Sequence, residues 1–525
     1  MKRGEVAKNI TRGAFFLGTE KGIAILSTLA YTALVARWLG PTKYGMFTLA
    51  FSVVSLATAF TGNFEMFLER YGAEYQVHGR LRTLTRAYQL ALGFKLAFGL
   101  IATAVLLAVA PSLAAFYQMP ELEVLLPLLA VFVATDGLAT TGRAILFSLQ
   151  RFEWVSGLSL IFNVGKTILV ATLWWMHQGL ASLALGFSIL TAVQAVATLG
   201  ASVWVLSRAR SQAAPEGAPE PGLLGSMVRY CLPLYGARLS FLSGQNLGKL
   251  VLGTVLDATQ LGYFSFAFQT VERFVELVHT IPQSLLPSLT QIVARNERER
   301  LRYVLDQAFR LIQLLACMLS FTLFVFAHEI VRVVGSPLFE PAIPLLRVLA
   351  LVPIARTAQQ PLTMLFQAAR HPGYVFALAL VKLLSEIAGY FILLGPFGAM
   401  GASAANLAGA AASFTGALIL ASTVLKEGTF DRLGAVMRNI LLLAPSLMLT
   451  LFAERELGVQ GSLAARLALI VPSVLGVFAL GLVNRYDLEK VSSLPLPGAW
   501  LPRVRNLCVA VADRLARTFE HRRAA

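Results

Sequence analysis

Charged residues are scarce in this sequence. They make up 14% of it, whereas apolar residues make up 57%. Soluble domains contain about 25% charged residues, so this chain has too few to cover the surface of a soluble protein. Stretches without any Asp, Glu, Lys or Arg occupy residues 96–120, 179–207 and 387–425. A helix needs about 20 apolar residues to cross a bilayer and pairs its own backbone groups there. These stretches therefore predict membrane-spanning helices.

Residues that usually carry catalysis are also scarce. The three cysteines, Cys231, Cys317 and Cys508, have no motif spacing, and nothing indicates a disulfide framework. No Walker motif, cluster of metal ligands or pairing of a nucleophile with a base stands out. We therefore expect no catalytic residue, metal or cofactor, and predict that the protein is not an enzyme.

The apolar stretches predict about fourteen transmembrane helices, so the predicted fold class is an all-α polytopic membrane protein. The spans are expected near residues 13–37, 44–64, 88–110, 124–148, 154–176, 180–206, 230–256, 260–288, 305–334, 342–368, 374–394, 399–425, 439–453 and 467–484.

The positive charge follows these predicted spans. The formal net charge is +16, and the chain has 44 Lys and Arg residues. If cations within five positions of a span end are counted with the adjoining loop, thirty lie at the N-terminus, in the even-numbered loops and in the C-terminal tail, but only six lie in the odd-numbered loops. Because positive loops stay in the cytoplasm, we expect a multi-pass protein of the bacterial inner membrane with both termini cytoplasmic. The same distribution argues against nucleic acid as a partner.

A repeat divides the chain. The segment LGPTKYGMFTLAF at 39–51 matches LDATQLGYFSFAF at 256–268 at six of thirteen positions, with an offset of 217. Six predicted spans separate the copies, which predicts two six-helix lobes in parallel orientation. The expected domains are an N-terminal lobe (1–207), a cytoplasmic linker (208–229), a C-terminal lobe (230–425), two additional helices (426–485) and a basic amphipathic tail (486–525). The tail is expected either on the anionic leaflet, with membrane lipids as partners, or on the protein's own underside.

Eight cations lie more than five positions from either end of a predicted span, and each costs about 2.5–3.5 kcal/mol at the bilayer centre. They are Lys21, Lys95, Lys166, Arg238, Lys249, Arg273, Arg356 and Lys382. Lys95 is expected to extend toward the cytoplasmic interface. Lys382 lies one turn from Glu386, so either a structural ion pair or a ligand site is consistent with the sequence.

Polar residues form three helical stripes in the C-terminal lobe. The stripes are Arg238, Gln245 and Lys249; Gln269, Glu272, Arg273, Glu276 and Gln283; and Arg356, Gln359, Gln360, Thr363 and Gln367. One stripe could simply join two helices. Three stripes in one lobe favour a hydrated cationic cavity, which is suited to an anion such as phosphate.

Several segments resemble the polysaccharide-biosynthesis flippases of the multidrug/oligosaccharidyl-lipid/polysaccharide exporter superfamily. The resemblance covers about residues 5–425. It rests on RWLGPTKYGMF at 37–47, ERYGAE at 69–74, FEPAIPLLRVL at 339–349, QAARHP at 367–372 and GAMGASAA at 398–405.

The resemblance implies an alternating-access flippase for an undecaprenyl-diphosphate-linked oligosaccharide. Its products would serve O-antigen, capsule, exopolysaccharide or cell-wall assembly, with polysaccharide polymerase or export proteins as further candidate partners. The expected substrate-binding residues are Arg238, Lys249, Arg356, Arg273, Lys21, Lys166, Gln245, Gln359 and Gln360. The candidates for ion coupling are Glu272, Glu276, Asp136 and Glu386. A multidrug antiporter of the same superfamily and a non-transporting scaffold are the alternatives.

Overall fold

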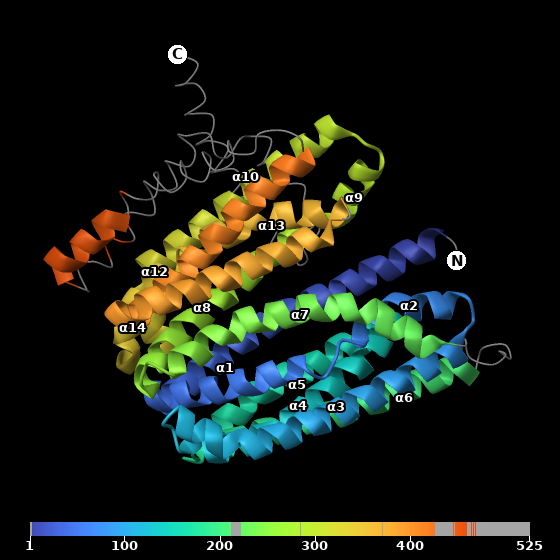
Figure 1. Ribbon diagram of the computed structural model, residues 1–525, viewed down its shortest axis with the longest axis horizontal. Coiled ribbons are helices and arrows are strands. Elements are labelled where there is room, and N and C mark those ends of the chain that lie inside the picture. The colour runs from blue at the N-terminus through green and yellow to red at the C-terminus, as the bar shows by residue number, and fades with distance from the viewer. Residues whose placement is uncertain are drawn as a thin grey trace. The chain divides into compact units, whose positions relative to one another are not determined.

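The computed structural model describes residues 3–211, 222–283, 285–369 and 371–425, together with 445, 447–458, 464, 466 and 468. Within these ranges every regular element is a helix (Figure 1). This confirms the predicted all-α fold class. The C-terminal tail, most of the two last predicted spans and residues 212–221 of the predicted linker lie outside the described residues.

Six helices precede residue 212. They are α1 (Arg3–Ala59), α2 (Glu65–Val77), α3 (Leu81–Phe116), α4 (Glu121–Ser148), α5 (Phe152–Trp175) and α6 (Leu180–Ser211). Inside α1 the backbone turns at Gly40, whose φ of 68° only glycine adopts readily. This turn separates the first two predicted spans. Helix α4 packs against both α3 and α6, and the three run side by side in Figure 1.

The second half is more interrupted. Its elements are α7 (Leu223–Gly253), α8 (Ala258–Gln283), α9 (Leu286–Ala294), α10 (Arg298–Val325), α11 (Ala327–Ile330), η1 (Val331–Gly335), η2 (Pro337–Ala342), α12 (Ile343–Leu349), α13 (Val352–Ala368) and α14 (Pro372–Leu425). Helix α14 turns at Gly398, where φ is 52°. This turn separates the eleventh and twelfth predicted spans.

Eight of the described helical segments are long and apolar enough to cross a membrane. Helices α7 and α8, which carry two of the polar stripes, are not among them. Three predicted spans are each divided between two or more elements. The span 260–288 ends at Gln283, and α9 begins separately with a proline in its first turn, where proline is favoured. The span 305–334 ends its α-helix at Val325, and 342–368 is divided between α12 and α13.

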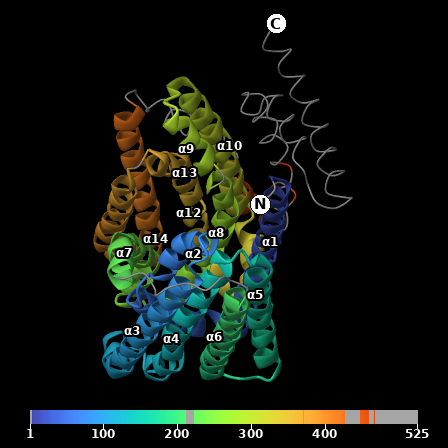
Figure 2. The same cartoon turned by 90° about the vertical axis from the view of Figure 1, so that its right-hand side faces the viewer.

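The chain forms two compact units. The first comprises Met1–Leu277, His328–Leu349 and Gly373–Ser413, and the second comprises Val278–Ala327, Ala350–Pro372 and Phe414–Ala525. In the second unit α9, α10 and α13 pack together (Figure 2), around buried Leu289, Leu305 and Leu365. The first unit contains both copies of the sequence repeat.

The two repeat copies contact each other inside the first unit. The hydroxyls of Thr42 and Thr259 lie 2.8 Å apart, and their positions differ by the repeat offset of 217. A Cβ atom on Gly45 would lie 1.9 Å from the carbonyl oxygen of Ala258. A Cβ atom on Gly262 would lie 2.0 Å from the carbonyl oxygen of Pro41. Equivalent residues thus make reciprocal contacts, as at an isologous interface, and only glycine permits this backbone approach.

This contact predicts that Gly45→Ala and Gly262→Ala each destabilise the protein by about 1–3 kcal/mol, because the added methyl group collides with backbone. Thermal unfolding of the detergent-purified variants measures the effect. Gly93→Ala is the matched control, since a Cβ atom there meets nothing within 4 Å. If both variants unfold at the wild-type temperature, the close backbone contact between the two repeat copies is contradicted.

Candidate functional site

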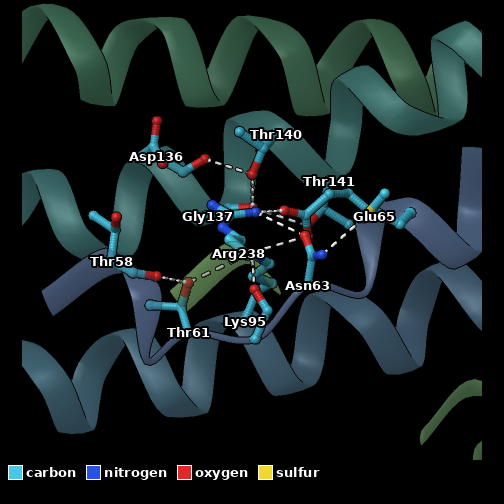
Figure 3. Close-up of polar contacts among 12 residues, drawn as sticks. Thr58, Thr61, Asn63, Glu65, Lys95, Asp136, Gly137, Thr140, Thr141 and Arg238 are labelled. Carbon is cyan, nitrogen blue, oxygen red and sulfur yellow. Dashed lines mark hydrogen bonds and ion pairs between the residues drawn. The ribbon is translucent and has the colours of Figure 1, made fainter. Parts of the chain in front are cut away.

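A group of buried and half-buried polar side chains joins four helices of the first unit. We call it the Glu65 cluster: Asn63, Glu65, Lys95, Asp136 and Arg238 (Figure 3). Glu65 begins α2, directly after the loop that follows α1, and an acidic residue is favoured in the first turn of a helix. Lys95 lies on α3, Asp136 on α4 and Arg238 on α7.

Glu65 pairs with both cations of the cluster. Its Oε1 accepts a hydrogen bond from Nη1 of Arg238, and its Oε2 lies 3.0 Å from Nζ of Lys95. Arg238 also donates to Oδ1 of Asn63 at 2.8 Å, and Lys95 donates to the carbonyl oxygen of Gly62 at 2.9 Å. The side chain of Lys95 is 0% exposed and that of Glu65 10%. The pairing therefore compensates charges that have almost no access to solvent.

Asp136 brings a second carboxyl group to the cluster and interacts electrostatically with Lys95 and Arg238. The next residue, Gly137, makes room for the lysine: a Cβ atom there would lie 3.2 Å from Cδ of Lys95. The cluster has two cations and two carboxylates, so it is formally neutral. Its net charge alone gives it no preference for an anion.

The sequence analysis misjudged part of this cluster. Lys95 does not place its ammonium group in solvent, because its side chain is 0% exposed and pairs with Glu65. Glu65 was not among the expected functional residues. It lies just past the predicted second span, and its partners are distant in sequence. The one available signal was an acidic residue followed at once by the apolar sequence Met-Phe-Leu.

A second set of cations lies on α5, α7 and α8, and we call it the lysine group: Lys166, Lys249 and Arg273. Nζ of Lys166 donates to Oγ1 of Thr28 at 3.2 Å and lies 5.6 Å from the ring centre of Tyr31. Nζ of Lys249 lies 5.6 Å from the ring centre of Phe268. These are cation–π contacts.

The lysine group carries more positive charge than its close partners neutralise. Arg273 interacts electrostatically with both lysines and has an ion pair with Glu276 at 3.3 Å. Among the described residues no carboxylate lies within ion-pair distance of Lys166 or Lys249. Glu272 and Glu276 act on the lysines only at longer range. The three cations of the group thus exceed the two neighbouring acids, Glu272 and Glu276. This excess of positive charge is the composition of an anion-binding site.

The hairpin of α14 holds another buried carboxylate. Glu386 is 2% exposed, pairs with Lys382 at 2.8 Å and accepts a hydrogen bond from Asn406 at 3.0 Å. Of the two interpretations left open by the sequence, the ion pair is present. A role of Glu386 in ion coupling stays a prediction.

Apart from Lys21, the remaining expected site residues lie on α7 and α13. Gln245 lies half-buried on α7. Arg356, Gln359 and Gln360 lie half-buried on α13, in the second unit. The side chain of Lys21 lies outside the described residues. In the described part of the chain, no three His, Cys, Asp or Glu residues are grouped as metal ligands would be.

The Glu65 cluster predicts that replacing Glu65 by the neutral glutamine strongly destabilises the folded protein. Glu65→Gln leaves Lys95 and Arg238 without their shared carboxylate, and removing one partner of a buried pair costs about 3–5 kcal/mol. Thermal unfolding in detergent should show a markedly lower midpoint. Glu297→Gln is the control, because its pair with Arg300 is solvent-exposed and such pairs contribute about 0–1 kcal/mol. Equal midpoints for the two variants would contradict the pairing.

Three comparisons place the protein among known ones. Solved structures share its fold. They include an inward-facing multidrug resistance MATE family transporter of the MOP superfamily (TM-score 0.60, 14% identity, 77% of this chain and 94% of that one). The lipid II flippase MurJ in an inward closed conformation is also similar (TM-score 0.61, 14% identity, 90% and 99%). So is a MOP superfamily transporter from Pyrococcus furiosus, described as having a binding pocket of reversed polarity (TM-score 0.53, 13% identity, 80% and 96%).

A comparison with curated protein sequences gives no match. The family model for polysaccharide biosynthesis proteins matches residues 34–344. That range is more than half of the chain and includes both repeat copies, the Glu65 cluster and the lysine group. The protein is therefore a multi-pass membrane protein with the fold of MOP superfamily transporters, and it belongs to the polysaccharide biosynthesis protein family.

Proposed function

We propose that the protein is an alternating-access flippase that moves an undecaprenyl-diphosphate-linked oligosaccharide from the cytoplasmic to the outer leaflet of the inner membrane. The observation that carries this proposal is the lysine group. Lys166 and Lys249 lie on predicted spans, and a hydroxyl and aromatic rings accompany them instead of ion-paired carboxylates. Such cations are costly in a bilayer and mark a substrate or ion pathway.

The chemistry of the group suits a diphosphate. Arg273 can donate paired N–H groups to phosphate oxygens, and each lysine supplies a point charge. The hydrocarbon tail of the substrate would stay in the bilayer. With both termini cytoplasmic, outward movement of an anion is favoured by about 2.3 kcal/mol per charge per 100 mV. The membrane potential can then contribute to transport without a nucleotide.

Arg238 and Lys249 have different partners and therefore different roles in this proposal. Both lie on α7, eleven residues apart, which corresponds to about 16 Å along the helix. Lys249 has an aromatic neighbour, whereas Arg238 is already bound by Glu65 and Asn63. We assign the head group's first strong contact to the lysine group. Arg356, Gln359 and Gln360 remain proposed ligands in the second unit.

A multidrug transporter is the other function suggested by the fold, since two of the similar structures carry that description. A site for cationic drugs favours acidic or apolar walls. The lysine group has the opposite character, with three cations and two acids, and this supports the flippase.

The proposed function predicts that Lys249→Gln and Lys166→Gln each lower export by about tenfold or more, the loss expected for one charged contact to a buried phosphate. Cells that depend on the variant should accumulate the lipid-linked sugar precursor on the cytoplasmic side. Arg302→Gln, which removes an exposed cation of α10, is the control and should export normally. Normal precursor levels in both lysine variants, at wild-type protein levels, would refute this site.

Alternating access predicts that the reciprocal contact between the repeat copies opens during transport. A disulfide between Thr42→Cys and Thr259→Cys, in a background with Cys231, Cys317 and Cys508 replaced by alanine, should stop export under oxidation. Reduction should restore it. Gly99→Cys with Ala134→Cys is the control, because it joins α3 to α4 within the first half, where the two Cβ positions are 3.3 Å apart. Undiminished export by the oxidised Thr42–Thr259 pair would show that this contact does not open.

A further inference from the structure

Glu65 occupies the position on Arg238 that an oxyanion substrate would take. We infer that Glu65 is an internal competitor for the phosphate group: the head group displaces it from Arg238, and this competition limits substrate affinity so that the substrate can be released. The inference rests on the proposed function, because it assumes that a phosphate-bearing head group passes α7. Glu65 is thus a specificity-determining residue, and Arg238 is its binding partner.

The partners of Arg238 come from one short segment. Among the residues that the structure describes, its guanidinium has hydrogen bonds to Asn63 and Glu65. Both follow Gly62, whose φ of 83° marks a turn that most other residues would resist. Movement of this segment alone would release the guanidinium, whose side chain is already 24% exposed.

Lys95 explains how Glu65 can leave Arg238 without becoming an isolated charge. It holds Oε2 of Glu65 at 3.0 Å and has no exposed surface, so it is inaccessible to a substrate. When phosphate takes the guanidinium, Glu65 keeps its ion pair with Lys95. One carboxylate therefore has a permanent partner and an exchangeable one, and the difference in exposure between the two cations separates these roles.

The exchange also avoids an unpaired arginine in the empty protein. A buried cation without a partner is costly, and the ion pair with Glu65 compensates the charge of Arg238 when no substrate is present. A purely structural ion pair would stabilise the fold equally well but would have no influence on anion affinity. The two interpretations therefore differ in a measurable quantity.

Binding of inorganic pyrophosphate to the purified full-length protein in nanodiscs tests the inference. The most informative variant is Glu65→Gln combined with Lys95→Met, which removes the competitor and its permanent partner together and keeps the formal charge of the cluster at zero. We expect it to bind pyrophosphate about tenfold more tightly than wild type, a typical size for coupling between two sites. Adding Arg238→Gln should abolish the gain. Glu65→Gln alone should shift affinity in the same direction where it folds.

A control variant and a separate measurement distinguish the outcomes. Glu297→Gln removes an exposed carboxylate of equal charge and should not change pyrophosphate affinity. If Glu65→Gln/Lys95→Met binds no more tightly than wild type, or if its gain survives Arg238→Gln, Glu65 is not a competitor and the inference is overturned. A different measurement rejects the proposed function: normal precursor export in the Lys166 and Lys249 variants. The inference about Glu65 and the proposed function can therefore be rejected separately.

Discussion

The burial of charge in a bilayer is the constraint on which this structure depends. Every ion at that depth must be paired, solvated or placed against a polarisable group. The first unit uses two of these solutions. Lys95 and Arg238 share the carboxylate of Glu65, whereas Lys166 and Lys249 lie against aromatic rings. The shared carboxylate joins helices together. In the segments that the structure describes, the aromatic contacts leave the charge of the two lysines without an ion-paired carboxylate.

Helix packing follows from the first solution. The pairing of Glu65 with Arg238 connects α2, in the first half of the chain, with α7, which begins inside the predicted linker. The contact of Thr42 with Thr259 connects the same two halves near the other predicted end of the spans. One contact is ionic and the other depends on two glycines that allow close backbone approach. Both contacts are of kinds that can separate and form again, as the proposed alternating access requires.

Much of the fold could be predicted from the sequence because apolar runs are a local signal. The helices α3 to α6 follow such runs, and the turns at Gly40 and Gly398 separate spans that were expected to be separate. Helix α2 was missed because it is short and mixes charged with apolar residues. The pairing of Glu65 with Arg238 could not be predicted, since 173 residues separate them and no local pattern reports such a contact.

Movement of the head group through the cationic region is tested most directly in proteoliposomes. The measurement follows a fluorescent short-chain polyprenyl-diphosphate sugar from the inner to the outer leaflet, with protection from a membrane-impermeant quencher as the readout. Wild-type protein should transfer the probe faster than empty liposomes, and Lys249→Gln should lose most of that transfer. Equal transfer by wild type and Lys249→Gln, or none above empty liposomes with wild type, would contradict a cationic path for a phosphate-bearing lipid.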